Sequence, residues 1–308
     1  MNRVLFLYLA ALTLVVSGCT AVPAPAAPKG VQRRPMVMAT FSILGDMVHH
    51  IGGDLVDLKT LVGPGSDVHE FEPSPSDALN MRNADVIVEN GLGLESWLNR
   101  LYVSSGSQAR RVAASNGIPV RSRTANGNTE SDPHVWQDVH NAISMTLTIR
   151  DALADADPVH ASAYQSNAAS YIVQLQTVDH DIQTEVNRLP MASRKLVTSH
   201  DALGYFAARY GFEITGSLLG TVATASGDPS AKEFAQLVRD IKAAGVRAVF
   251  VESVTNKDAM DRLAQEAGVI VGPELYTDSL GETGSEGATY ISAMSHNAHA
   301  IVSALLGP

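Results

Sequence analysis

The feature that most constrains the fold is a long stretch near the middle of the chain that lacks helix-breaking residues. Residues 139–189 contain no glycine, and their only proline is Pro158. Proline is tolerated in the first turn of a helix but not in its interior. The pattern therefore predicts one helix that ends near Ala156 and a second, unusually long helix that begins near Pro158. Apolar residues recur along the second helix with helical spacing, at Tyr164, Tyr171, Leu175, Val178, Ile182 and Val186.

Short apolar runs typical of strands alternate with helical patterns on both sides of this stretch. These runs lie at 35–41, 55–62, 85–88, 195–198, 213–219, 248–252 and 269–271. Such alternation is typical of parallel sheets built from β-α-β units. We therefore expect an α/β fold with an N-terminal lobe at 35–157, a connecting helix at 158–189 and a C-terminal lobe at 190–308. Open α/β sheets bind ligands beyond the carboxyl ends of their strands, so the cleft between the lobes is the expected site.

The N-terminus carries the pattern of a secretory signal. Residues 4–16 form an almost wholly apolar run of thirteen, preceded by Arg3. A bilayer-spanning helix needs about 20 residues, so this run favours a signal peptide at 1–18. The string Val16-Ser17-Gly18-Cys19 resembles a bacterial lipobox. The resemblance implies cleavage before Cys19 and attachment of lipid to its sulfur.

A proline-containing segment at 19–34 follows the signal and is predicted to be an extended tether. We therefore expect the folded part of the chain in the periplasm or at the extracellular face, anchored to the membrane through Cys19.

Composition excludes several classes of protein. The 308 residues are 45% hydrophobic, which is enough to build a substantial core. Lysine and arginine number 22 against 32 acidic residues, giving a formal net charge of −10. Phosphate backbones attract the opposite sign, so a nucleic-acid partner is not expected. A single cysteine excludes a disulfide framework, a Cys-rich zinc finger and an iron–sulfur cluster.

Four residues that can bind a metal share one context, because each lies in a loop or at a strand end. His69 follows the run at 55–62, and His134 ends a polar loop at 120–133. His200 follows the run at 195–198, and Asp278 follows the last short strand. Two residues come from each predicted lobe, so one ion bound to all four would join the lobes. Three imidazoles and one carboxylate suit tetrahedral Zn²⁺, whereas Mn²⁺ prefers more oxygen ligands.

Spacing alone does not establish this site, but five strings resemble a known family. The chain is similar to the metal-binding proteins of bacterial zinc and manganese ABC importers, the cluster A-I solute-binding family. The resemblance implies that His69, His134, His200 and Asp278 are the metal ligands. The matching strings are Ala39-Thr40-Phe41-Ser42-Ile43-Leu44-Gly45-Asp46, His69-Glu70-Phe71-Glu72-Pro73-Ser74, Asp132-Pro133-His134-Val135-Trp136, His200-Asp201-Ala202-Leu203-Gly204-Tyr205-Phe206 and Tyr276-Thr277-Asp278-Ser279-Leu280.

The function that the resemblance implies is capture of a divalent metal outside the cytoplasm by a monomer, and its delivery to a membrane ABC permease. Manganese members usually have Glu where this chain has His200, which favours Zn²⁺ as cargo; Mn²⁺, or both metals, is the alternative. The segment 122–132 contains no histidine, so it lacks the His-rich loop of many zinc-specific members.

Two functions of other classes are the alternatives. A zinc hydrolase is one, because His69 is followed by a possible general base, Glu70. Four protein ligands leave no open position for catalytic water, so we expect no enzyme. A surface adhesin is the other, since lipoproteins of this family have been described as host-matrix binders. Near the metal, Glu70 and Glu72 are candidates to accept an imidazole N–H, and Trp136 to wall the site.

Overall fold

The structure is a computed structural model that describes residues 33–125, 128–220, 229–255 and 257–307. The predicted signal peptide at 1–18, the lipidation site Cys19 and residues 19–32 of the tether lie outside the described residues. The long helix α5 (Ala161–Val186) divides the described chain into two parts. The N-terminal half precedes α5, and the C-terminal half follows it.

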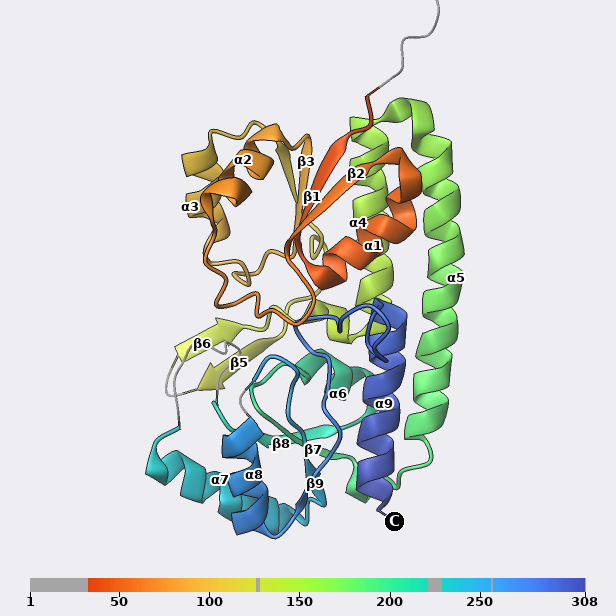
Figure 1. The fold of residues 1–308 in the computed structure, drawn as a ribbon. Helices are drawn as coiled ribbons and strands as arrows, with labels where there is room; N and C mark the ends of the chain where they lie inside the picture. Colours follow the sequence, from red (N-terminus) through yellow and green to blue (C-terminus); the bar gives the residue numbers. More distant parts are fainter. Residues whose placement is uncertain (1–32, 126–127, 221–228, 256, 308) are drawn as a thin grey trace, which may run out of the picture. The chain divides into compact units, whose positions relative to one another are not determined.

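A four-stranded parallel sheet forms the centre of the N-terminal half (Figure 1). The strand order is β2-β1-β3-β4, with β1 (Met36–Phe41), β2 (Asp57–Val62), β3 (Val86–Glu89) and β4 (Arg110–Ala113). The central strand β1 is buried at every position except its first. Three helices of this half connect these strands: α1 (Ser42–Gly52), α2 (Pro75–Asn83) and α3 (Leu98–Ser105). The parallel pairing and the strand–helix alternation confirm the predicted α/β class.

A β-hairpin occupies a segment that the sequence predicts to be a loop. Strands β5 (Ser122–Ala125) and β6 (Asn128–Ser131) pair in antiparallel register. The segment was predicted to be a loop because it is polar and lacks the apolar alternation of a half-buried strand. The hairpin lies beside the C-terminal half in Figure 1, and its base leads directly to Pro133 and His134.

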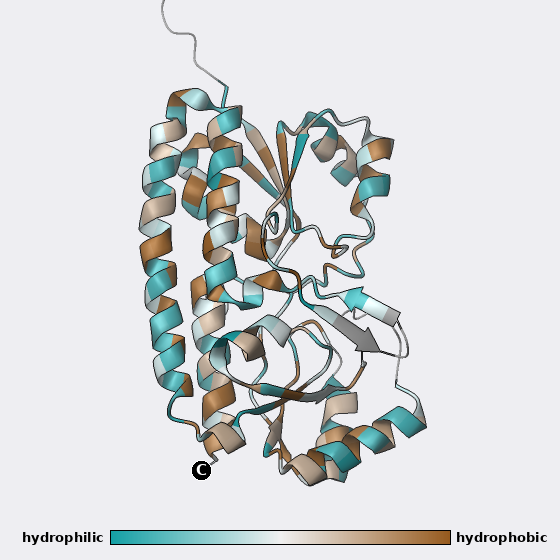
Figure 2. Ribbon diagram, turned by 180° about the vertical axis from the view of Figure 1, so that it is seen from behind, coloured by the Kyte–Doolittle hydropathy of each residue, from teal (hydrophilic) through white to brown (hydrophobic). Residues whose placement is uncertain are grey.

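Two long helices follow, as the glycine-free stretch predicts. Asp138 is the N-cap residue of helix α4 (Val139–Ala156). Its side chain accepts a hydrogen bond from the backbone N–H of His140. A single 3₁₀ turn at Pro158–His160 leads into α5, so the long helix starts slightly later than predicted. The buried stripe of α5 contains the six predicted apolar residues together with Ala168. Hydrophilic and hydrophobic residues alternate along the long helices in Figure 2, consistent with one buried face each.

Strand pairing in the C-terminal half is short and interrupted. Strand β7 (Lys195–Thr198) pairs in parallel with β8 (Glu213–Ser217) across an irregularity in register. Two-residue strands β9 (Ala248–Val249) and β10 (Ile270–Val271) form a second parallel pair. Isolated bridges join Thr198 to Phe250 and Glu252 to Leu275. The helices are α6 (Gly204–Tyr210), α7 (Ala231–Ala244), α8 (Lys257–Ala267) and α9 (Tyr290–Leu306).

One apolar core extends through both halves. It includes β1, the buried faces of α4, α5 and α9, and residues of the C-terminal half such as Phe206 and Phe250. Helix α5 packs against α1, α4 and α9 (Figure 1). A smaller cluster lies between β7, β9, α7 and α8. The predicted division into lobes at 157 and 190 stays a prediction.

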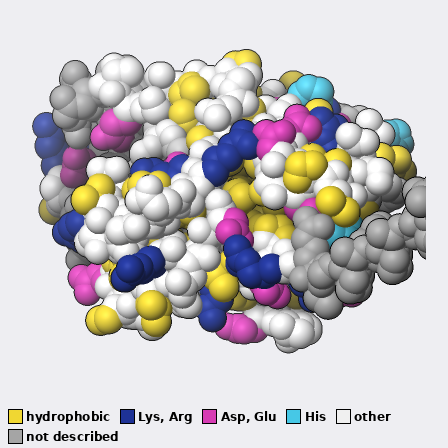
Figure 3. Space-filling model, turned by 90° about the horizontal axis from the view of Figure 1, so that it is seen from above, with side chains coloured by type: hydrophobic (Ala, Val, Ile, Leu, Met, Phe, Trp, Pro, Cys, Tyr) yellow, Lys and Arg dark blue, Asp and Glu magenta, His cyan; other side chains and the backbone are white. Residues whose placement is uncertain are grey.

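The surface of the folded part carries charges of both signs. Acidic and basic side chains are interspersed over the face shown in Figure 3. Among the described residues, none of the helices combines the length and the apolar character needed to span a membrane.

Candidate metal-binding site

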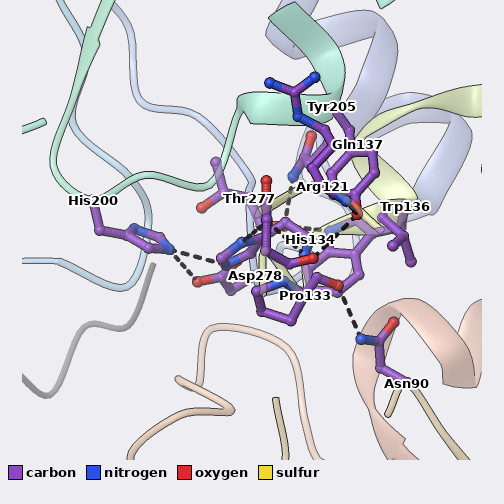
Figure 4. A network of polar contacts seen from close by, with 12 residues as sticks. Asn90, Arg121, Pro133, His134, Trp136, Gln137, His200, Tyr205, Thr277 and Asp278 are labelled. Carbon is purple, nitrogen blue, oxygen red and sulfur yellow. Dashed lines mark hydrogen bonds and ion pairs between the residues drawn. The ribbon is translucent and has the colours of Figure 1, made fainter. Parts of the chain in front are cut away.

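The four candidate ligands converge from segments far apart in the sequence. His69, His134, His200 and Asp278 each offer one ligand atom, and these atoms all lie within 4.8 Å of one another. Nε2 of His200 lies 2.9 Å from Oδ2 of Asp278 and 3.3 Å from Nε2 of His134. In Figure 4 the side chains of His200, His134 and Asp278 point toward one another.

Several of these separations are close to those between ligands of a single small cation. Ligands bound tetrahedrally to zinc at about 2.0–2.1 Å lie about 3.3 Å from each other. Asp278 Oδ1 is 3.4 Å from Nε2 of His134, and Oδ2 is 3.5 Å from Nε2 of His69. Both carboxylate oxygens therefore face imidazole nitrogens.

The environment of the Asp278 carboxylate favours a bound cation. The residue is wholly buried, and neither of its oxygens has a partner in hydrogen-bonding geometry among the described residues. Nε2 of His69 is buried without such a partner as well. Buried polar atoms are normally hydrogen-bonded, and an unpaired buried carboxylate is especially costly. A metal ion at the centre of the four side chains would satisfy these atoms together.

His134 is held by the acidic residue that precedes it by two positions. Oδ1 of Asp132 accepts a hydrogen bond from the backbone N–H of His134 at 3.0 Å and lies 2.9 Å from its Nδ1. A carboxylate can only accept, so Nδ1 carries the hydrogen and Nε2 is left for a metal. Tyr205 of α6 donates a hydrogen bond to the carbonyl of Asp132 and accepts one from the backbone of Arg121.

His200 is paired with Glu252, a buried residue at the end of the run that contains β9. Nδ1 of His200 lies 2.5 Å from Oε2 of Glu252. Burial alone would lower the pKa of His200, but attraction to Glu252 and Asp278 raises it well above its ordinary value. Burial alone would raise the pKa of Asp278, but the nearby His200 and His134 hold it well below its usual range. Protons and a metal ion therefore compete for the same imidazole nitrogens.

The segments that carry His134 and Asp278 are joined by hydrogen bonds to one carbonyl oxygen. Nε1 of Trp136 and the side-chain amide of Gln137 both donate to the carbonyl of Thr277, each at 2.8 Å. The indole ring of Trp136 is fully buried and packs edge-on against His134.

His69 differs from the other three because it keeps some exposure to solvent. It lies in the loop between β2 and α2, where its backbone N–H donates to Asp67. Trp97 fixes the preceding residue by donating from its indole nitrogen to the carbonyl of Val68. This loop also touches the C-terminal half, because Gly65 donates its N–H to the carbonyl of Leu280.

The carboxylates that contact the imidazoles are not those that the sequence suggested. Glu70 and Glu72 are exposed, whereas Asp132 and Glu252 lie against His134 and His200. Asp132 has a local signal, since it precedes His134 by two residues. Glu252 is 52 residues from His200, and its only signal is a charged residue at the end of an apolar strand. Spacing along the chain cannot reveal such a contact.

Comparison with known proteins agrees with this geometry. Residues 37–304 match the family model ZnuA, described as the periplasmic component A of the zinc-uptake complex. The manganese-binding lipoprotein MntA of Halalkalibacterium halodurans is 35% identical over 309 residues, which cover 99% of each chain. The iron-binding protein YfeA of Yersinia pestis is 30% identical, over 93% of each chain.

A solved structure shares the fold. The periplasmic zinc-binding protein TroA of Treponema pallidum superposes with a TM-score of 0.82 and 32% identity, covering 89% of this chain and 99% of TroA. The relatives therefore divide among manganese, zinc and iron in their names, while the fold and the transport class are shared. The expectations of a solute-binding protein and of no enzyme are confirmed. This chain belongs to the ZnuA family, the extracytoplasmic metal-binding components of ABC importers.

Proposed function

We propose that this protein captures one Zn²⁺ ion through His69, His134, His200 and Asp278 and delivers it to a membrane permease. The observation that carries the proposal is the wholly buried carboxylate of Asp278, which faces three imidazole nitrogens at 2.9–3.5 Å and has no partner in hydrogen-bonding geometry among the described residues. Divalent-metal binding for import follows from the family. The ligand set and the preference for zinc are the parts proposed here.

The donor set supports zinc. Three nitrogens and one oxygen are ligands that zinc takes in tetrahedral sites. Affinity alone cannot identify the physiological cargo, because Zn²⁺ binds more tightly than Mn²⁺ to almost any such site.

Manganese is the second candidate, and two observations favour it. The relative MntA is named for manganese and is 35% identical to this chain. Both oxygens of Asp278 face the centre of the site, so a bidentate carboxylate could raise the coordination number toward the value that Mn²⁺ prefers.

Capture requires the ion to lose its water and the site to lose a proton. Three of the four side chains are completely buried, so an ion held by all four has little room for a water ligand. Protons compete with the metal for the three imidazoles, so binding weakens in acid. We further propose that a lipid on Cys19 and the tether at 19–34 hold the protein beside the permease.

The test is metal analysis of the protein purified from its native host without added metal, followed by separate titrations of the metal-free protein with Zn²⁺ and Mn²⁺. One equivalent of zinc per chain supports the proposal. Manganese alone in the native protein would overturn the preference for zinc and leave capture intact.

A matched pair of variants tests the ligand set. His200→Ala should abolish tight binding, whereas His299→Ala should bind normally because His299 is exposed on α9. Wild-type protein that binds neither metal would overturn capture itself.

A further inference from the structure

A single buried carboxylate contacts both segments that supply ligands from the C-terminal half. Glu252 is 1% exposed. Its Oε1 accepts a hydrogen bond from the backbone N–H of His200 at 3.0 Å. Its Oε2 lies 2.5 Å from Nδ1 of His200 and accepts a hydrogen bond from the hydroxyl of Thr277 at 2.8 Å. Thr277 is the residue immediately before Asp278.

These contacts determine which nitrogen of His200 is available to a metal. An ionised carboxylate has no hydrogen to donate, so the imidazole nitrogen that faces it is the one that carries hydrogen. Nδ1 is therefore turned toward Glu252, and Nε2 is directed at Asp278 and His134. The opposite tautomer would place a hydrogen on Nε2, where it would block coordination.

Backbone hydrogen bonds place the strands on either side of Glu252. Phe250 donates its N–H to the carbonyl of Val197, and Leu275 donates to the carbonyl of Val251. Glu252 adds side-chain contacts to the loops that follow these strands. Asp132 supports His134 alone, from two residues away. Glu252 instead joins loops that are 77 residues apart, between His200 and Thr277.

We propose that Glu252 is a positioning residue: it fixes the tautomer of His200 and the separation of His200 from Asp278 before the metal arrives. The inference rests on the proposed function, because it assumes that these two side chains bind the ion. It predicts that Glu252 controls metal affinity without touching the metal.

The decisive variant is Glu252→Gln in the full-length protein. The glutamine side chain has nearly the same shape but only one acceptor oxygen, whereas Glu252 receives donors on both oxygens. Its NH₂ group would therefore face either the backbone N–H or Nδ1 of His200. In the second arrangement His200 must switch tautomer to accept the new hydrogen bond. The matched control is Glu266→Gln, which removes the same charge from an exposed position on α8.

Zinc affinity is measured by competition with a chromophoric chelator, and the tautomer of His200 by nitrogen NMR of labelled histidine. Loss of a group that orients a metal-binding histidine typically weakens affinity about 10–100-fold. We expect this loss in Glu252→Gln, together with a new His200 tautomer in the metal-free protein. Glu266→Gln should stay within about twofold of wild type, because an exposed charge is screened by water.

Thr277→Val keeps the inference testable if Glu252→Gln does not fold. It removes one donor to Glu252 and leaves the carbonyl that accepts from Trp136 and Gln137 in place. A several-fold loss of zinc affinity supports the inference.

Wild-type affinity in Thr277→Val together with wild-type affinity in any folded Glu252→Gln overturns the inference. A lower melting temperature in Glu252→Gln with an unchanged tautomer and unchanged affinity also overturns it, since that result shows a structural role alone. In both cases loss of binding in His200→Ala shows that the proposed function still holds.

Discussion

Each half of the molecule has a buried glutamate near the carboxyl ends of its strands, but the two residues connect different parts of the structure. Glu95 in the N-terminal half accepts hydrogen bonds from the hydroxyl of Thr40 and the backbone N–H groups of Asn90 and Gly91. It thereby joins the end of β1 to the turn that follows β3. Glu252 in the C-terminal half joins the loops that carry His200 and Asp278.

The difference lies in what each glutamate contacts. Backbone hydrogen bonds join neighbouring strands in both halves, as between β1 and β3 and between Phe250 and Val197. Glu95 is linked to a ligand-bearing segment only through Asn90, whose side chain donates to the carbonyl of Pro133. Glu252 instead contacts the ligand His200 directly. A buried glutamate can therefore support the fold in one half and a metal ligand in the other.

The largest expected effect is the loss of zinc affinity when a ligand is removed, and this loss can be compared between the two halves. His200→Ala should weaken zinc binding by at least about 1,000-fold, roughly 4 kcal/mol, because it removes both a ligand and the imidazole that lies against the buried carboxylates of Glu252 and Asp278. His69→Ala should cost less, because water can reach its partly exposed position. Calorimetric titration of both variants measures the difference. Equal losses would show that the partial exposure of His69 does not reduce its contribution to binding.

The next effect concerns the pH dependence of stability through Glu95. Burial raises the pKa of Glu95 from 4.5 to about 7, although its hydrogen bonds oppose the shift. A raised pKa in the folded state stabilises the protein fully below pH 4.5, and this contribution is lost as the pH rises through 7. The pKa difference corresponds to about 3 kcal/mol. Metal-free wild type should therefore lose about this much stability relative to Glu95→Gln between pH 4.5 and 7.5, measured by urea unfolding.

If the stabilities of wild type and Glu95→Gln changed with pH in the same way, the raised pKa of Glu95 would be ruled out. The same variant also tests the comparison between the two glutamates. If Glu95→Gln weakened zinc binding as strongly as Glu252→Gln, the two residues would have the same role and the contrast would fail.

The smallest effect is expected from Tyr205→Phe, which loosens a contact between the halves. The hydroxyl of Tyr205 accepts from the backbone of Arg121 and donates to the carbonyl of Asp132. Its removal leaves both backbone groups without this partner, at a cost of about 1–2 kcal/mol of stability. Zinc affinity should fall less than tenfold, because Asp132 keeps its contacts with His134. A larger fall in competition titrations would mean that Tyr205 helps to place His134.

The sequence predicted those parts of the fold that local periodicity determines. The strands that become β1, β2 and β3 and the long helix α5 follow from apolar spacing and from the absence of glycine. Strand β4 was not predicted, because it has four residues and two are arginines. The hairpin was missed because its residues are polar. Backbone pairing between strands does not require an apolar pattern.

For the site, the candidate ligands could be named from the sequence, but the carboxylates that contact them could not all be named. Motif resemblance brought His69, His134, His200 and Asp278 together as candidates, and the structure places them around one point. Glu252 was not predicted, because only the tertiary fold brings it to His200. Glu70 seemed a natural neighbour of the ligands by sequence, yet it points to solvent. Adjacency in sequence is a poor guide to which carboxylate supports an imidazole.

Helix α5 sets a mechanical limit on how the molecule can move. Its 26 residues contain neither glycine nor proline, so it forms a rod about 39 Å long with no internal point of weakness. Bending is therefore expected at its two junctions, the 3₁₀ turn at Pro158–His160 and the short connection after Val186. Because α5 also packs against α1, α4 and α9, we expect that motion on loading or release of cargo is limited to small tilts about these junctions while the helix itself stays straight.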